Sequence, residues 1–189
     1  MENALSQIKD ALGFKKDDYL YIRPGTRKGF LDVLDLRTED YSREKVVHLY
    51  ASIQSIEIEQ LYNQLSGNNL TSHFAILGIG QVEPMFTYFY LSFTKLAEIP
   101  GIINTINSLI NTKIIAFYSD YEDIEKILDI YEKGDIDLWR RFYIMPLLYY
   151  LSGKSEKGIE VMAPLLKFGL VPDQNCKLFY DNYCNFLTS

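Results

Sequence analysis

Acidic and aromatic side chains suited to binding are concentrated in one stretch of this chain. Between Asp120 and Asp137 eight acids stand against two lysines, a balance of −6 that equals the net charge of the whole 189-residue protein. Carboxylates interleaved with tyrosines suit a basic protein surface, because opposite potentials orient a partner and aromatic rings anchor it. The predicted partner-binding residues are Tyr118, Asp120, Tyr121, Glu122, Asp123, Glu125, Asp129, Glu132, Asp135 and Asp137.

The same acids have a second interpretation as ordinary helix construction. Ser119, with Glu122 three residues later, fits a capping box. Two acid–lysine pairs at i,i+4 spacing are Glu122–Lys126 and Asp129–Lys133. This interpretation leaves Asp135 and Asp137 unexplained, because they lie beyond the predicted helix. A third interpretation, a calcium site, lacks the loop glycine and the ligand spacing that such a site needs, so the sequence predicts no metal and no cofactor.

Histidine and cysteine are the other residue types that could carry chemistry, and the chain has two of each. They are His48, His73, Cys176 and Cys184. Structural zinc sites usually take their ligands as close pairs, and these four residues are scattered. The cysteines lie eight residues apart in a helical pattern, too far for a disulfide, and are predicted to be free, buried thiols. No neighbouring base marks a nucleophile, so the sequence predicts a protein without enzymatic activity.

Composition limits the classes of partner. The pI near 5.0 argues against a nucleic-acid binder, because neutralising phosphates requires clustered lysine and arginine. No apolar run approaches the ~20 residues of a membrane-spanning helix. The N-terminus lacks the basic start and apolar core of a signal peptide. We therefore expect a cytoplasmic protein with no nucleic-acid or membrane partner.

Periodicity predicts the elements that position these residues. Alternation of apolar and polar side chains indicates strands, and apolar residues at i, i+3 and i+4 indicate helices. This predicts the order helix, three strands, helix, two strands and helix, at residues 3–12, 18–23, 30–36, 46–53, 58–65, 73–79, 86–93 and 100–110. A hairpin connection is expected at residues 80–84, between the last two strands.

Beyond Lys113 the pattern becomes mostly helical. Residues 114–118 (IIAFY) are predicted as one more strand, because they are largely β-branched and aromatic. Helices follow at residues 119–134, 138–151, 156–168 and 173–187, with Pro146 and Pro164 expected to cause kinks or later helix starts. The prediction is an α+β fold, an antiparallel sheet with helices on it in a domain of residues 1–113. A helical extension, residues 114–189, is expected to pack on that domain.

The strand predicted at residues 86–93 carries aromatic side chains on both faces. Phe86, Tyr88 and Tyr90 point one way, and Phe89 and Phe93 point the other. Helices on one face of the sheet would bury only one of these sets. The other set needs cover from the C-terminal helices, from a second copy of the chain or from a bound ligand segment.

The element order of residues 1–112, α-β-β-β-α-β-β-α, resembles that of the small acidic chaperones of bacterial type III secretion. The best local likeness runs from Leu65 to Asn111, with the strand segments SHFAILGIG and MFTYFYLSF and a closing helix. The resemblance implies a homodimer that wraps an extended segment of a secreted effector. It includes no motif, so it assigns no role to any single residue.

These observations favour a non-enzymatic, stoichiometric protein-binding protein of a bacterial secretion or toxin system. A secretion chaperone would need an exposed apolar groove for an effector segment. An immunity protein would instead use the acidic, tyrosine-bearing surface to neutralise a basic toxin. The remaining hypothesis is an enzyme or a small-molecule sensor whose site is assembled from scattered residues, with His48, His73 and Cys184 among the candidates.

Overall fold

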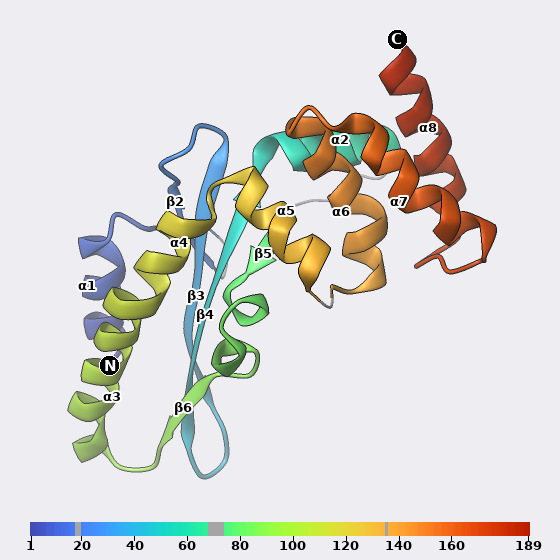
Figure 1. Ribbon diagram of the computed structural model, residues 1–189. Coiled ribbons are helices and arrows are strands. Elements are labelled where there is room, and N and C mark those ends of the chain that lie inside the picture. Colours follow the sequence, from blue (N-terminus) through green and yellow to red (C-terminus); the bar gives the residue numbers. More distant parts are fainter. Residues whose placement is uncertain (18–19, 68–73, 135) are drawn as a thin grey trace. The chain divides into compact units, whose positions relative to one another are not determined.

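The computed structural model describes residues 1–17, 20–67, 74–134 and 136–189, and it has the predicted α+β fold (Figure 1). A six-stranded antiparallel sheet is combined with helices, many of them in the C-terminal half. Within these residues, none of the helices has the length and apolar character that crossing a membrane would require. His73 and Asp135, two residues singled out from the sequence, lie outside the described ranges.

The chain divides into two compact units. The first contains residues 1–54 and 77–122, and the second contains residues 55–76 and 123–189. The chain therefore passes between the units after Gln54, Ile76 and Glu122, whereas the sequence-based division places a single boundary at residue 113. Helix α2 (Ile56–Ser66) belongs to the second unit, although it lies in the N-terminal half of the sequence.

The first unit contains almost the whole sheet. Its strands are β1 (Lys15–Asp17), β2 (Leu20–Pro24), β3 (Phe30–Asp40), β4 (Lys45–Ser55), β5 (Ala75–Gly78) and β6 (Tyr90–Phe93). The strand order is β1-β2-β3-β4-β5, with β6 also paired to β4. Because β3 occupies one edge of β4, strands β5 and β6 share the other edge. Strand β6 runs antiparallel along the start of β4, with Lys45 opposite Phe93 and His48 opposite Tyr90.

Helices of the first unit cover one face of this sheet (Figure 1). They are α1 (Glu2–Ala11), α3 (Ile99–Leu109) and α4 (Ile115–Tyr121). The cross-strand pairs Tyr21–Leu34 and Arg23–Asp32 point to the same face, since side chains alternate along a strand. The Lys9 ammonium of α1 lies 3.5 Å from the centre of the Tyr21 ring. Tyr118 of α4 packs near Asp32, so both helices cover this face.

The second unit is helical. Its helices are α2, α5 (Ile124–Lys133), α6 (Leu138–Leu151), α7 (Ser155–Lys167) and α8 (Cys176–Thr188). Helix α6 packs against α2, α5 and α7, and its residues 142–149 are all buried, as expected for a central helix. At Gly158 of α7 a Cβ atom would lie 3.1 Å from the Pro146 Cα atom and 2.5 Å from the Tyr183 hydroxyl. Glycine therefore allows α7 to approach α6 closely.

Stacked and edge-on aromatic rings form the core of the second unit. Tyr62 of α2 contacts the rings of Phe74, Trp139, Tyr143 and Phe179, with centroid distances between 5.4 and 6.0 Å. Such pairs add to the hydrophobic stabilisation that the buried area provides. The ring of Tyr62 thus joins α2 to the C-terminal helices α6 and α8.

The prediction for residues 114–118 is wrong. This segment is helical: a π-helical turn at Ile110–Ile114 leads from α3 directly into α4. Ile106, Ile110, Ile114 and Phe117 are all buried, so the apolar stripe of α3 continues through this segment at helical spacing. Burial on one helical face outweighs the strand propensity of these β-branched and aromatic residues. Ser119 consequently lies inside α4, and the cap of α5 is Asp123.

Two further sequence predictions differ from the structure. The hairpin expected at residues 80–84 is replaced by two 3₁₀ turns, Ile79–Gln81 and Pro84–Phe86. Strand β6 starts only at Tyr90, because Pro84 starts a turn and has no amide hydrogen to donate to a neighbouring strand. Helix α6 continues through Pro146 and helix α7 continues through Pro164, so no new helix starts at either proline.

Candidate functional site

The predicted acidic surface is divided between the two units. Tyr118, Asp120, Tyr121 and Glu122 belong to the first unit, on α4 and at its C-cap. The described acids that follow belong to the second unit, on α5 and at the start of α6; they are Asp123, Glu125, Asp129, Glu132 and Asp137. The ten residues predicted to bind a partner therefore do not belong to one structural element.

The aromatic part of the predicted surface is turned inward. Tyr118 is buried and its hydroxyl donates to the Val33 carbonyl at 2.6 Å. Tyr131, which is interleaved with the same acids, is also buried and donates to the Ile76 carbonyl. Tyr121 is half-buried, with its ring 5.7 Å from that of Phe117. Tyr118 thus supports the sheet unit from inside and is not available to a partner in this conformation.

Most of the exposed acids of the segment have contacts within the protein. Asp123 and Asp137 cap α5 and α6 by accepting from the amides of Glu125 and Arg140, at 2.9 and 2.8 Å. The remaining acid contacts are Glu125–Lys154 at 2.5 Å, Asp129–Lys133 at 2.5 Å and Glu132–Tyr149 at 2.7 Å. The predicted pair of Asp129 with Lys133 is therefore present. Asp120 is exposed on α4.

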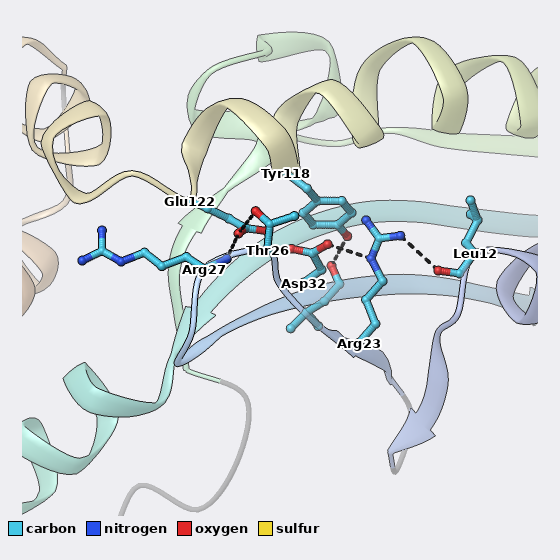
Figure 2. A network of polar contacts seen from close by, with 8 residues as sticks. Leu12, Arg23, Thr26, Arg27, Asp32, Tyr118 and Glu122 are labelled. Atoms are coloured by element: carbon cyan, nitrogen blue, oxygen red, sulfur yellow. Dashed lines mark hydrogen bonds and ion pairs between the residues drawn. The ribbon is translucent and has the colours of Figure 1, made fainter.

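Glu122 has a different role from the one its sequence position suggests. Its side chain is only 6% exposed and points toward the turn between β2 and β3. Its Oε2 atom accepts from the Thr26 hydroxyl and from the Arg27 amide, each at 2.5 Å (Figure 2). A Cβ atom on Gly25 would lie 2.8 Å from Glu122 Oε1, so the turn needs glycine there to close around the carboxylate.

A buried ion pair lies beside this turn. Asp32 of β3 is 2% exposed, and its Oδ2 accepts from Arg23 Nε at 2.7 Å. Arg23 also donates to the Leu12 carbonyl at 3.0 Å, and its guanidinium lies 5.4 Å from the centre of the Tyr118 ring (Figure 2). Strand β2, the end of α1 and helix α4 are thus joined through one arginine.

The two carboxyl groups of this network have shifted pKa values in opposite directions. Burial raises the pKa of Asp32 to about 6, and the neighbouring Glu122 adds to the rise while Arg23 opposes it. Burial alone would raise the pKa of Glu122, but the hydrogen bonds from Thr26 and Arg27 outweigh it and lower that pKa. The pair was missed from the sequence because its members are 90 residues apart and no motif marks them.

Of the described residues considered for catalysis, His48 belongs to the first unit, whereas Cys176 and Cys184 belong to the second. His48 is half-buried on β4, with its Nε2 atom 3.2 Å from Glu39 Oε2. Cys176 is buried against Tyr143, and burial raises the pKa of its thiol. Cys184 is half-buried in an open hollow of about 800 Å³ at α7 and α8, and burial together with the proximity of this thiol raises the pKa of Tyr180. Among the described residues, no three histidine, cysteine or acidic side chains are grouped to hold a metal ion.

Two strongly exposed aromatic residues lie at or just before strand β6. Tyr88 and Tyr90 are 89% and 58% exposed, whereas Phe93 is buried. Of the two sets predicted for residues 86–93, the Tyr88–Tyr90 side is therefore the uncovered one, apart from Phe86, which is buried in the preceding turn. We call the outer edge of β6, together with the exposed side chains of Tyr41, Tyr88, Tyr90 and Leu96, the β6 surface.

The outer edge of β6 is also available for pairing. In the part of the chain that the structure describes, β6 pairs with β4 alone. A strand has two hydrogen-bonding edges, so the second edge of β6 presents amide and carbonyl groups without a strand partner. The segment from Tyr90 to Phe93 carries no charge.

Two hollows adjoin the end of β6. One, of about 380 Å³, lies beside α1 and α3 and includes Thr38 and Ile99. The other, of about 250 Å³, includes Tyr41 and Arg43. Both are lined by Lys45, Phe93 and Leu96. The hollows thus lie at the Phe93 end of β6, and the lining that they share combines Phe93 and Leu96 with Lys45.

Further exposed apolar side chains occur in the second unit, around the connection between α7 and α8. They are Phe168, Leu170 and Leu178. These side chains lie on helices and their connection and not on a strand. The β6 surface is therefore the better candidate for binding an extended polypeptide.

Comparison with known proteins gives no significant match to any protein-family model, curated protein or solved structure.

Proposed function

We propose that the protein is a non-enzymatic binding protein that captures an extended segment of a protein partner along strand β6. In this proposal it acts as a stoichiometric, chaperone-like protein of a bacterial secretion or toxin system. The observation that carries the proposal is the combination of an unpaired, uncharged strand edge with exposed tyrosines beside it. A natural sheet usually protects such an edge, so leaving it open favours a binding role.

The backbone of β6 supplies the attraction for an extended chain. An added strand would hydrogen-bond to the outer edge of β6 and continue the sheet past β4. Main-chain hydrogen bonds do not depend on the partner's sequence, so they suit a protein that holds a segment in an unfolded form. Hydrogen bonding at this edge thus provides affinity, and side chains must provide selectivity.

The side chains of the β6 surface favour an apolar segment. Alternate residues of an added strand lie about 6.8 Å apart on one face, so one set would meet Tyr88 and Tyr90. Tyrosine gives a large contact area for little loss of side-chain entropy. A second apolar contact is available at Leu96, which is exposed and lines the two hollows. We therefore expect a partner segment with alternating apolar residues and little charge.

The immunity-protein hypothesis has weaker support. It needs an exposed surface that combines acids with tyrosines, and Tyr118 and Glu122 are buried. Four of the remaining acids, among them Glu125 and Asp129, are already paired with cations or cap helices. Each exposed ion pair contributes little to stability, but its cation weakens the negative electrostatic potential that would attract a basic toxin.

Selection of a random dodecapeptide library displayed on phage against the immobilised protein tests the proposal. We expect enriched peptides to be poor in charge, with apolar residues at alternate positions. Synthetic versions should shift the backbone amide resonances of β6. Their affinity, measured by fluorescence anisotropy, should fall at least tenfold in the Tyr88→Ser, Tyr90→Lys double variant, as expected when aromatic anchors are removed.

Two control variants separate the alternatives. Charge reversal by Glu125→Lys and Asp129→Lys should leave peptide affinity unchanged. Enrichment of lysine- and arginine-rich peptides that this reversal abolishes would contradict the proposal and favour the immunity hypothesis. A dimer that Tyr90→Lys converts to a monomer, without peptide enrichment, would instead assign the β6 surface to a second copy of the chain.

A further inference from the structure

Asp32 has one carboxylate oxygen that the ordinary contacts of the fold do not satisfy. Its Oδ2 atom accepts from Arg23, whereas its buried Oδ1 atom has no hydrogen-bond donor among the described residues. The carboxyl group of Glu122 lies within hydrogen-bonding reach of Asp32, and Figure 2 shows the two side chains close together. Two ionised carboxylates cannot hydrogen-bond to one another, so a hydrogen bond between these two side chains would need one shared proton.

The surroundings decide which of the two carries that proton. Glu122 Oε2 accepts from the Thr26 hydroxyl and the Arg27 amide, and both donors favour an ionised carboxylate. Asp32 is the more deeply buried residue, and Arg23 is the single cation bound to it among the described residues. A protonated Asp32 can donate from Oδ1 to Glu122 while its other oxygen still accepts from Arg23. All buried groups of the pair are then satisfied.

We propose that Asp32 and Glu122 share one proton, and that this proton fastens the end of α4 to the β2–β3 turn. Glu122 is the residue at which the chain leaves the first unit, and the next residue, Asp123, caps α5. Loss of the proton would place two negative charges beside one arginine. Repulsion would then loosen Glu122 from Thr26 and Arg27 and release the turn.

Four elements contribute the charged and polar groups of this network and of the sheet face next to it. Strand β2 contributes Arg23, and α4 contributes Tyr118 and Glu122. Helix α1 contributes Lys9, whose ammonium lies over Tyr21, and the turn contributes the Arg27 amide. Burial raises the pKa of the Tyr118 hydroxyl well above its usual value, so that hydroxyl stays neutral at acid and neutral pH. Asp32 and Glu122 are therefore the groups that titrate in this network.

The pKa shifts of Asp32 and Glu122 define the pH range in which the contact between α4 and the turn is strongest. The pKa of Asp32 is raised to about 6, so its stabilising effect is complete below its ordinary value of 3.8 and is lost as the pH rises through about 6. The pKa of Glu122 is lowered, so its effect is present above its ordinary value of 4.5 and is lost as the pH falls through the lowered value. The fastening is therefore strongest between about pH 4.5 and pH 6, and it loosens above this range.

Carboxyl carbon NMR of the full chain tests the shared proton directly. Asp32 is expected to titrate near pH 6 and Glu122 below pH 4.5. In Glu122→Gln the negative charge beside Asp32 is gone, so the Asp32 titration should move toward acid pH. Titration of Asp32 at or below pH 4 in the wild-type protein would overturn the proposal.

Hydrogen exchange at the Arg27 amide reports the fastening itself. Its protection factor should fall about tenfold between pH 5 and pH 7.5, as Asp32 ionises. Asp32→Asn keeps a donor toward Glu122 and an acceptor for Arg23, so protection in this variant should be constant with pH. The control Asp40→Asn removes an exposed carboxylate and should behave as wild type. If the protection of the Arg27 amide still depends on pH in Asp32→Asn, the proposed mechanism is wrong. If Asp32→Asn does not fold, the same measurement in Glu122→Gln provides the test.

Discussion

Two regions of the chain are rich in tyrosine, and they use it in opposite ways. In the acidic segment, residues 118–137, Tyr118 and Tyr131 are buried and each hydroxyl donates to a backbone carbonyl of a strand. At the β6 surface, Tyr88 and Tyr90 are exposed beside an unpaired strand edge. The buried tyrosines of the acidic segment thus stabilise the fold, whereas the tyrosines of the β6 surface remain accessible to a partner.

The difference follows from what surrounds each ring. A buried tyrosine usually needs a hydrogen-bond partner for its hydroxyl, and both buried tyrosines of the acidic segment donate to a backbone carbonyl. Several acids nearby cap helices or form ion pairs with lysines, and Glu122 accepts hydrogen bonds from the β2–β3 turn. Strand β6 offers no such internal partner at its outer edge among the described residues. The composition of a segment therefore shows that its side chains can form contacts. The topology decides whether those contacts are made within the fold or remain open to a partner.

Matched tyrosine truncations give the largest expected contrast. Tyr131→Ala removes a buried ring and leaves the Ile76 carbonyl without its donor, so unfolding free energy should fall by about 4 kcal/mol. Tyr90→Ala removes an exposed ring, and its effect should stay within about 0.5 kcal/mol. Urea denaturation followed by circular dichroism measures both. Equal losses in the two variants would mean that the β6 surface is covered in solution.

A pair of glutamates in the acidic segment gives the next contrast. Glu122→Ala leaves the Thr26 hydroxyl and the Arg27 amide without an acceptor, so we expect a loss of about 2 kcal/mol. Glu125→Ala removes only an exposed ion pair with Lys154, which should cost about 0.5 kcal/mol or less. The same denaturation measurement at pH 5.5 compares them. A larger loss of unfolding free energy in Glu125→Ala than in Glu122→Ala would contradict this prediction. It would mean that the exposed ion pair with Lys154 stabilises the segment more than the contacts with the β2–β3 turn do.

Much of the fold could be predicted because local periodicity is strong in the long elements. Residues 46–53 alternate cleanly and form most of β4, and the apolar run at residues 138–151 forms α6. Periodicity failed where two signals conflict. Residues 114–118 have strand propensity but continue the helical stripe of α3, and the stripe prevails because it buries Ile114 and Phe117.

The candidate sites were only partly visible in the sequence. The double set of aromatics at residues 86–93 indicated an uncovered face, which corresponds to Tyr88 and Tyr90 of the β6 surface. That β6 has a free edge depends on strand order, which a single sequence does not specify. The contact of Glu122 with Thr26 spans 96 residues, so no local pattern could reveal it. Local spacing instead suggested Lys126 as the partner of Glu122.

The smallest contrast concerns single hydroxyl groups on α4. Tyr118→Phe keeps the buried ring but removes the donor to the Val33 carbonyl, so unfolding free energy should fall by about 1 kcal/mol. Tyr121→Phe changes a half-buried ring three residues later, and its effect should be within about 0.3 kcal/mol. Neither substitution should alter peptide affinity at the β6 surface. A loss of peptide affinity in Tyr118→Phe, at unchanged stability, would show that the buried tyrosines of the acidic segment and the open edge of β6 are not separate in function.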